Sequence, residues 1–393
     1  MESSLFTSSK NSKESGITKM KIAILTQPLH TNFGGTLQNF ALQRVLKEMG
    51  HTVETIDYDW GQASDLKKIL SFCKNYFLGK KPNLFFFNSE LDYISKKHNL
   101  FISHNIFLSN KILDTSTLVN YFEEKKFDAV IVGSDQVWRV AYSPKIENFF
   151  LDFLIGNKEI KKIAYAASFG LDEWQFSAED TFYIKNLIKE FNYISVREDT
   201  AVTLCKNFLD LDVEHVLDPT LLLKKDEYIK LFDCTKFSRG GIFSYILDNN
   251  EDKIEKIDLL CKTLDKKSFI CMPKKTKKEK IFINNREDYV YPNIEEWIGS
   301  FYKADYVITD SFHGTVFSII FNKPFIAISN NERGATRFKS LLNFFNLEDR
   351  LVDAKDEIDV SMIFKPINYE FINDKISGLK RTNMKKIQKI LES

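Results

Sequence analysis

The sequence lacks several features that would place it in a specialised class. It has no apolar run of roughly 18 or more residues, the length that a membrane-spanning helix needs. Its five cysteines form no Cys-x-x-Cys pair and have no metal-type spacing with histidine, so they predict free thiols in a reducing compartment. A formal net charge of +1 over 393 residues gives no general positive field, so nucleic acid is not an expected partner.

The N-terminal segment is polar and rich in serine, and it lacks the apolar stretch of a secretory signal. We predict that residues 1–19 are a disordered extension. From residue 20 onward, short buried strands alternate with amphipathic helices, the pattern of a doubly wound parallel sheet. Asp218-Pro219 interrupts this pattern, which then begins again. We therefore predict an α/β protein with two Rossmann-like domains, residues 20–222 and residues 223–393, the second ending in a long helix.

Ligands of such sheets bind beyond the carboxyl ends of the strands, so two facing domains predict a site in the central cleft. Four polar turns follow predicted strands. The first, "HTNFGGTLQ", has glycines at Gly34 and Gly35 that allow close approach of the backbone to an anion or a sugar at a helix N-terminus. The alternative is an ordinary turn in which Asn32 caps the helix.

The second turn, "VGSDQVWR", has a carboxylate at Asp135 that can accept a proton and an indole at Trp138 that can stack on a sugar. Its alternative is an aspartate cap and a core tryptophan. The third turn, "ISVRED", ends a strand with Arg197, whose guanidinium suits a phosphate or carboxylate. Its alternative is an ion pair with Glu198 or Asp199.

The fourth turn, "ITDSFHGT", has a histidine near the start of a helix. A helix N-terminus favours bound anions, and the imidazole of His313 can hold a phosphate or transfer a proton near neutral pH. The alternative is a buried histidine with protein partners. Apart from His30, which borders the first turn, we predict that the other histidines, including His98, lie in loops or on the surface.

Taken together with "AYAASFG" and "VLDPTLLL", these turns span Ile22–Ile328 and resemble the polysaccharide pyruvyl transferase family. The resemblance implies two domains arranged as in GT-B glycosyltransferases. It also implies transfer of pyruvate from phosphoenolpyruvate to a sugar of a surface polysaccharide or its precursor, with formation of a cyclic ketal and release of phosphate. No cofactor or metal is expected.

The resemblance assigns donor binding to Arg197 and catalysis to His313. We expect Asp135 to be the second catalytic residue, as the base toward a sugar hydroxyl. The other expected donor-binding residues are Ser311, Gly314, Thr315, Asn32, Gly34 and Gly35. The expected acceptor-binding residues are Gln38, Gln136 and Trp138. The first domain is the expected acceptor side, and the second contributes to the donor site.

The chain departs from the family pattern in three motifs. Some members have Arg-Leu-His at residues 311–313, where this chain has Ser-Phe-His, so one phosphate-binding arginine is missing. Gly-Ala is frequent where this chain has Gly34-Gly35, and asparagine is frequent at the position of Arg139. Two other functions stay open: a glycosyltransferase that uses a nucleotide sugar, and a carbohydrate-binding relative without activity.

The expected acceptor is a glycan or a lipid-linked oligosaccharide. Residues 66–87 mix lysines with aromatic side chains, a composition that suits peripheral contact with an anionic membrane. The alternative is a helix that packs on its own domain. The missing signal and the metabolic source of the donor predict a cytoplasmic protein that works at the inner face of the membrane.

Overall fold

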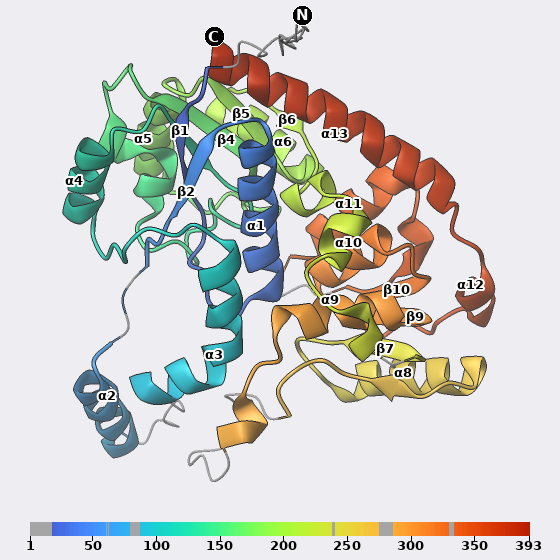
Figure 1. Cartoon of the computed structure of the whole chain (residues 1–393). Helices are drawn as coiled ribbons and strands as arrows, with labels where there is room; N and C mark the ends of the chain where they lie inside the picture. Colours follow the sequence, from blue (N-terminus) through green and yellow to red (C-terminus); the bar gives the residue numbers. More distant parts are fainter. Residues whose placement is uncertain are drawn as a thin grey trace, which may run out of the picture.

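The chain folds around two parallel β-sheets with helices on both faces (Figure 1). The computed structural model describes residues 18–59, 61, 63–78, 87–237, 240–274, 286–329 and 334–393. The expected extension, residues 1–19, lies almost wholly outside the described residues. Two parallel sheets with helical crossovers confirm the expected α/β class and its two Rossmann-like halves.

Over the residues that the structure describes, the first sheet has six strands in the order β2-β1-β3-β4-β5-β6, and every neighbouring pair is parallel. Its strands are β1 (Lys21–Leu25), β2 (Thr52–Ile56), β3 (Ala129–Val132), β4 (Lys161–Ala167), β5 (Tyr193–Val196) and β6 (Glu214–His215). Because all strands run the same way, their carboxyl ends and the turns that follow them lie along one edge.

Within the part of this half that the structure describes, the α-helices are α1 (Phe33–Glu48), α2 (Asp65–Phe77), α3 (Asn88–Asn105), α4 (Thr115–Lys125), α5 (Ala178–Ile188) and α6 (Asp199–Leu209). Side chains alternate along β1, as the two-residue period of a strand requires. Ile22 and Ile24 pack on the side of α1 and α3, whereas Ala23 and Leu25 pack on the side of α4, α5 and α6. Both faces of the sheet are therefore buried.

In the described residues, the second sheet has five parallel strands in the order β11-β10-β9-β7-β8. They are β7 (Ile242–Tyr245), β8 (Ser268–Phe269), β9 (Tyr306–Thr309), β10 (Phe325–Ile328) and β11 (Leu351–Val352). The helices of this half are α7 (Lys225–Ile229), α8 (Glu251–Leu264), α9 (Ile294–Lys303), α10 (Phe312–Ile320), α11 (Ala335–Phe345), α12 (Val360–Phe364) and α13 (Tyr369–Glu392).

The last helix, α13, runs along both halves of the molecule (Figure 1). Near its end, Ile387 and Leu391 are buried in the same apolar cluster as strand β1. Nζ of Lys161, in the first sheet, donates to the backbone carbonyl of Ile390 (2.9 Å). The C-terminal helix therefore starts in the second half and packs against the first sheet at its end. The expected division between residues 222 and 223 stays a prediction.

Aromatic packing joins the two halves beside the first turn. The rings of Phe33, in α1, and Trp297, in α9, stack with centroids 5.5 Å apart. Phe33 also contacts the ring of His98, which is fully buried on α3 and bonds Oγ1 of Thr36 through Nε2 (2.8 Å). The prediction that His98 lies at the surface is wrong, because its face of α3 packs against α1.

No helix among the described residues is long and apolar enough to cross a membrane.

Candidate active site

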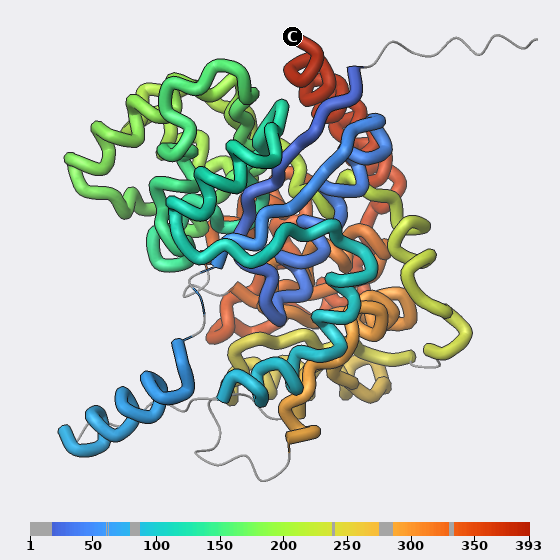
Figure 2. Tube along the Cα trace, turned by 60° about the vertical axis from the view of Figure 1, so that its left-hand side comes forward, coloured from blue at the N-terminus to red at the C-terminus, as the bar shows by residue number. Residues whose placement is uncertain are grey.

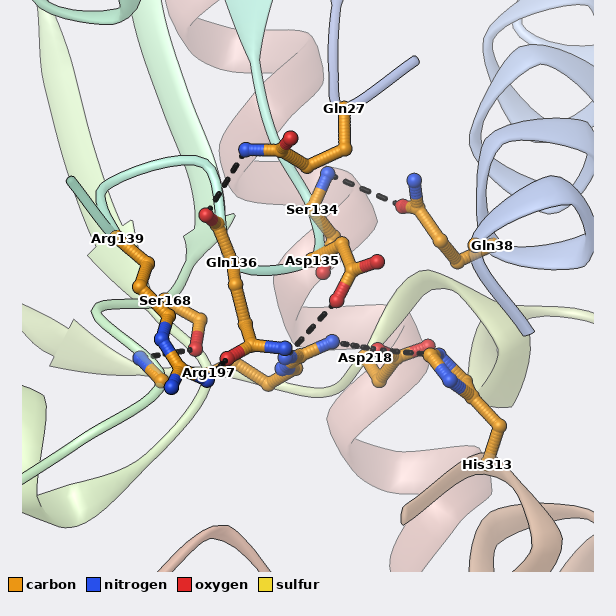
Figure 3. A network of polar contacts seen from close by, with 12 residues as sticks. Gln27, Gln38, Ser134, Asp135, Gln136, Arg139, Ser168, Arg197, Asp218 and His313 are labelled. Carbon is orange, nitrogen blue, oxygen red and sulfur yellow. Dashed lines mark hydrogen bonds and ion pairs between the residues drawn. The ribbon is translucent and has the colours of Figure 1, made fainter. Parts of the chain in front are cut away.

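The ends of three strands from the two sheets bring charged side chains together. Asp135 follows β3, Arg197 follows β5, and His313 follows β9 in the other sheet. Figure 3 shows Arg197 between Asp135 and Asp218, with His313 on the far side of Asp218. The structure therefore places three of the predicted site residues in one buried cluster, as the topology of facing parallel sheets allows.

Arg197 is enclosed by carboxylates. Its Nη1 lies 3.1 Å from Oδ2 of Asp218, its Nη2 lies 3.5 Å from Oδ1 of Asp135, and its Nε lies 3.8 Å from Oε2 of Glu198. Burial opposes the charge of the guanidinium, but these three carboxylates raise the pKa of Arg197 above its ordinary value. The predicted alternative, an ion pair with Glu198, is thus present, and two further carboxylates join it.

Asp218 links Arg197 to His313. Its Oδ1 accepts hydrogen bonds from the backbone N–H (2.9 Å) and Oγ1 (2.6 Å) of Thr220, which fixes the carboxylate at the start of a 3-10 turn, Pro219–Leu222. Its Oδ2 faces Arg197 and lies 3.7 Å from Nε2 of His313. Burial alone would raise the pKa of Asp218, but His313 and Arg197 outweigh it and hold the pKa well below the ordinary range.

Sequence reasoning treated Asp218 only as a break between elements. Its signal is the sequence Asp-Pro-Thr, in which an aspartate can accept from the N–H and hydroxyl two residues on. That pattern indicates a fixed carboxylate. It does not indicate that the free oxygen of this carboxylate faces an arginine and a histidine from other segments.

His313 is the second residue of α10 and is almost fully buried. Nε2 makes no hydrogen bond in the described structure, because 3.7 Å to Asp218 is beyond hydrogen-bond range. The other ring nitrogen, Nδ1, faces α1 of the first half: a β-carbon built on Gly34 would lie only 2.1 Å from it. Position 34 therefore has to be glycine, because any side chain there would collide with the imidazole of His313. The turn sequence alone did not show this contact between the two domains.

The N-terminus of α1 also approaches Asp135. Asn32 caps this helix, and its Oδ1 accepts from the N–H of Gly35 (3.2 Å). A β-carbon on Gly35 would lie 3.2 Å from Oδ2 of Asp135. The expected glycine pair thus lets the start of α1 come close to both the imidazole and the carboxylate, and the exposed Asn32 stands at the edge of the cluster.

Asp135 is held by an unusual backbone. It adopts φ of +66°, in the left-handed region that aspartate tolerates better than most residues. The preceding N–H, from Ser134, donates to Oε1 of Gln38 (3.1 Å), while Nε2 of Gln38 donates to Oγ1 of Thr26 (3.0 Å). Gln38 is fully buried, with both ends of its amide bonded to protein. This corrects its expected role in acceptor binding: it positions the turn that carries Asp135.

The structure separates the other two expected acceptor residues. Trp138 is buried, its ring stacks on Phe150 with centroids 5.1 Å apart, and its Nε1 donates to the carbonyl of Phe149 (3.0 Å). It offers no open face to a sugar, so the alternative of a core tryptophan is correct. Gln136 stays near the cluster, where its Oε1 accepts from Nη1 of Arg139 (2.8 Å; Figure 3).

Ser311, Gly314 and Thr315 build the first turn of α10. Oγ of Ser311 accepts from the N–H of Gly314 (3.3 Å), and Oγ1 of Thr315 donates to the carbonyl of Ser311 (3.2 Å). A β-carbon on Gly314 would lie 2.2 Å from Oγ1 of Thr309, so this glycine is needed for packing rather than for an open backbone. These three residues orient the turn on which His313 is presented.

A sequence model of the polysaccharide pyruvyl transferase family matches residues 32–332. The chain belongs to this family. It is therefore a transferase of a class that modifies polysaccharide. The matched region begins at Asn32 and includes Asp135, Arg197, Asp218 and His313, so the whole charged cluster lies within it.

Solved structures of an epimerase and a glycosyltransferase match most of the chain. One is the UDP-GlcNAc 2-epimerase of Methanocaldococcus jannaschii (TM-score 0.47, 11% identity, 92% of this chain and 93% of that one). Another is a glycosyltransferase of Rickettsia africae (TM-score 0.46, 12% identity, 95% of this chain and 93% of that one). No curated protein sequence matches the chain.

A further guanidinium reaches the cluster from outside the segment that the pyruvyl transferase model matches. Arg337, on α11, lies 5.6 Å from the ring centre of Phe312, and Arg197 lies 4.6 Å from the same centre. Burial and then the charge of Arg197 lower the pKa of Arg337 to about 10. Sequence reasoning missed Arg337, because nothing in its own helix marks it as part of a site.

Proposed function

We propose that the chain transfers pyruvate from phosphoenolpyruvate to two hydroxyls of one sugar, forming a cyclic ketal and releasing phosphate. The observation that carries the proposal is the contact between domains in a member of this family: His313 from one half meets Gly34 and Asp218, and Asp218 in turn pairs with Arg197. Such a site can hold a small anionic donor while a sugar enters from the other half.

The donor carries a phosphate and a carboxylate, so it needs more than one positive group. Arg197 is already balanced by three carboxylates and cannot by itself offset a further anion. Arg337 adds a second positive charge on the same aromatic ring, Phe312. The N-termini of α1 and α10 add backbone N–H groups at the same place. We assign the donor to these four elements.

His313 acts as the general acid in this scheme. It gives a proton to C3 of the enol, which makes C2 electrophilic, and the first sugar hydroxyl adds to C2 as Asp135 accepts its proton. The new C2–O bond replaces the carbon–carbon double bond, and the phosphate is still attached.

The second hydroxyl of the same sugar then attacks C2. The bond from C2 to the phosphate oxygen breaks, the proton of the hydroxyl leaves with phosphate, and two C–O bonds join pyruvate to the sugar. Arg197 and Arg337 stabilise the leaving phosphate as its charge increases. No redox change takes place, so the step needs no electron carrier.

Phosphate release from phosphoenolpyruvate, measured with a panel of acceptor glycans, tests the proposal. We expect release that depends on an acceptor, together with a ketal methyl signal by proton NMR. His313→Ala lowers kcat by about 10²–10⁴-fold, whereas His104→Ala, an exposed histidine on α3, leaves it unchanged.

Two results would contradict the proposal. Release that is equally fast in His313→Ala would remove the imidazole from the chemistry. The absence of release with every acceptor, together with a thermal shift given by a nucleotide sugar but not by phosphoenolpyruvate, would favour glycosyl transfer instead.

A further inference from the structure

Helix α2 stands apart from the body of the protein. In both views it extends away from the two sheets (Figures 1 and 2). None of its thirteen residues is buried. Most helices of a globular domain bury one apolar stripe against the core, so a helix with no buried residue needs another explanation for its composition.

That composition is strongly two-sided. Apolar residues recur at intervals of three and four, so they line one face, the α2 apolar face: Leu66, Ile69, Leu70, Cys73, Tyr76 and Phe77. All six are exposed, and 84% of Phe77 and 59% of Leu70 are accessible to solvent. Six exposed apolar side chains on one face of a projecting helix form a surface whose contact with water is unfavourable in free energy.

Lysines border this face. Lys67 and Lys74 are seven residues apart, which places them on the same side of the helix, next to Leu70 and Phe77. From residue 66 to residue 78 the sequence has three lysines and no aspartate or glutamate. A lysine at the border of an apolar face can extend its ammonium group toward phosphate while its methylenes stay in the apolar layer.

We propose that α2 docks on an anionic lipid bilayer, with the α2 apolar face in the acyl boundary and Lys67 and Lys74 on the lipid phosphates. Helices with an apolar face and a basic polar face lie in the plane of the interface in this way. At 1.5 Å per residue the helix is roughly 20 Å long, so its whole apolar face can enter at once. This proposal goes beyond the transfer reaction and does not depend on it.

The positive charge of the lysines favours an anionic bilayer, rather than a second copy of the chain, as the partner of α2. Two α2 apolar faces in a dimer would bring their lysine borders together, and like charges would oppose the contact. One helix of this length also covers far less than the roughly 800 Å² per partner that a stable protein interface needs. An anionic surface instead attracts the same lysines, each contributing to binding.

Docking through α2 would also orient the site. The helix follows β2 at the carboxyl edge of the first sheet, and Asp135 and Arg197 follow β3 and β5 at that same edge. Docking would then bring the membrane to the side of the molecule from which α2 projects, next to this edge. A glycan attached to a lipid in that membrane would be held near the candidate active site.

Sedimentation of the full chain with vesicles tests the proposal, using phosphatidylcholine with and without phosphatidylglycerol. We expect binding to the anionic vesicles that weakens as salt rises. Leu70→Ser combined with Phe77→Ser reduces binding about tenfold or more. Lys67→Gln combined with Lys74→Gln removes the preference for anionic lipid. Phe182→Ser, an exposed phenylalanine on α5, leaves binding unchanged.

A polarity-sensitive dye on the exposed Cys73 gives a second readout. Its emission shifts to the blue with anionic vesicles, and Cys73→Ser serves as the labelling control. The proposal is overturned if wild type does not bind anionic vesicles, or if the apolar double variant binds as well as wild type. It is also overturned if the chain dimerises in solution and the double variant abolishes the dimer. None of these outcomes alters phosphate release, so failure here and failure of the transferase proposal are distinguishable.

Discussion

Gly34 and His313 come from different halves of the chain, and the imidazole occupies the space that a side chain at position 34 would need. A β-carbon on Gly34 would lie 2.1 Å from Nδ1 and 2.2 Å from Cγ of the ring. Real β-carbons do not come this close to other heavy atoms. The first turn of the first half thus determines where the proposed general acid of the second half can lie.

The substitution Gly34→Ala should stabilise helix α1 and at the same time displace the imidazole of His313, so it has opposite effects on stability and on activity. Alanine favours a helix over glycine by about 1 kcal/mol, so α1 itself gains stability. The imidazole must move, however, and we expect kcat for phosphate release to fall by about 10²-fold, since a small displacement of a catalytic group has large effects. Gly378→Ala, in α13 with open space around it, is the matched control and keeps full activity. Normal activity of Gly34→Ala would show that His313 tolerates displacement.

Asp218→Asn removes the charge beside the imidazole and keeps the shape of the side chain. The carboxylate that binds Arg197 and faces His313 loses its charge, so we expect kcat for phosphate release to fall by about tenfold or more. The measurement is kcat of phosphate release together with thermal unfolding, which separates a loss of rate from a loss of folded protein. Asp152→Asn, which removes an ion pair with Lys145 on the other face of the first sheet, leaves kcat unchanged. A wild-type kcat in Asp218→Asn would assign Asp218 to structure alone.

Arg337→Met tests the donor site. Loss of a charge-assisted contact of about 1.5–3 kcal/mol raises KM for phosphoenolpyruvate by roughly tenfold to a hundredfold. KM for the glycan is expected to stay the same, because Arg337 lies with Arg197 around Phe312. Arg381→Met, exposed on α13, serves as the control. A change confined to the glycan KM would place Arg337 on the acceptor side.

The buried His98 makes stability depend on pH. Burial and then the charge of His30 lower the pKa of His98 to about 4, so the folded protein does not take up this proton until the pH is far below the unfolded value. Between about pH 6.5 and pH 4 the unfolded chain binds more protons, and the free energy of unfolding falls as the pH falls. The contribution of His98 over this window is on the order of 3 kcal/mol.

Denaturant unfolding at several pH values checks this expectation. His98→Gln keeps a hydrogen-bonding group for Thr36 but cannot titrate, so its stability falls less steeply with acid than that of wild type. His104→Gln, an exposed residue of the same helix, retains the wild-type slope. Equal slopes for His98→Gln and wild type would show that His98 takes up its proton as readily in the folded protein as in the unfolded chain.

Most of the sheet architecture was predictable because buried strands have a strong local signature. The runs that became β1, β3 and β9 are almost wholly apolar, and each ends in a polar turn. The helices Thr115–Lys125 and Asp199–Leu209 have a weaker signature, since their apolar stripes are short and start beside polar turns. Strand β8 is only two residues long at the edge of its sheet, which leaves little local pattern to predict it from.

The sequence by itself determined which turns carry chemistry, since a glycine pair, a carboxylate, an arginine and a histidine each follow an apolar strand. Only the tertiary structure decided how these groups pair. Oδ2 of Asp218 faces both Arg197 and His313, and the lack of a side chain at Gly34 leaves room for the imidazole of His313. Trp138 turns into the core instead of toward a sugar. Local sequence sets the backbone of a turn, but the direction and charge environment of a side chain depend on residues that arrive from distant segments.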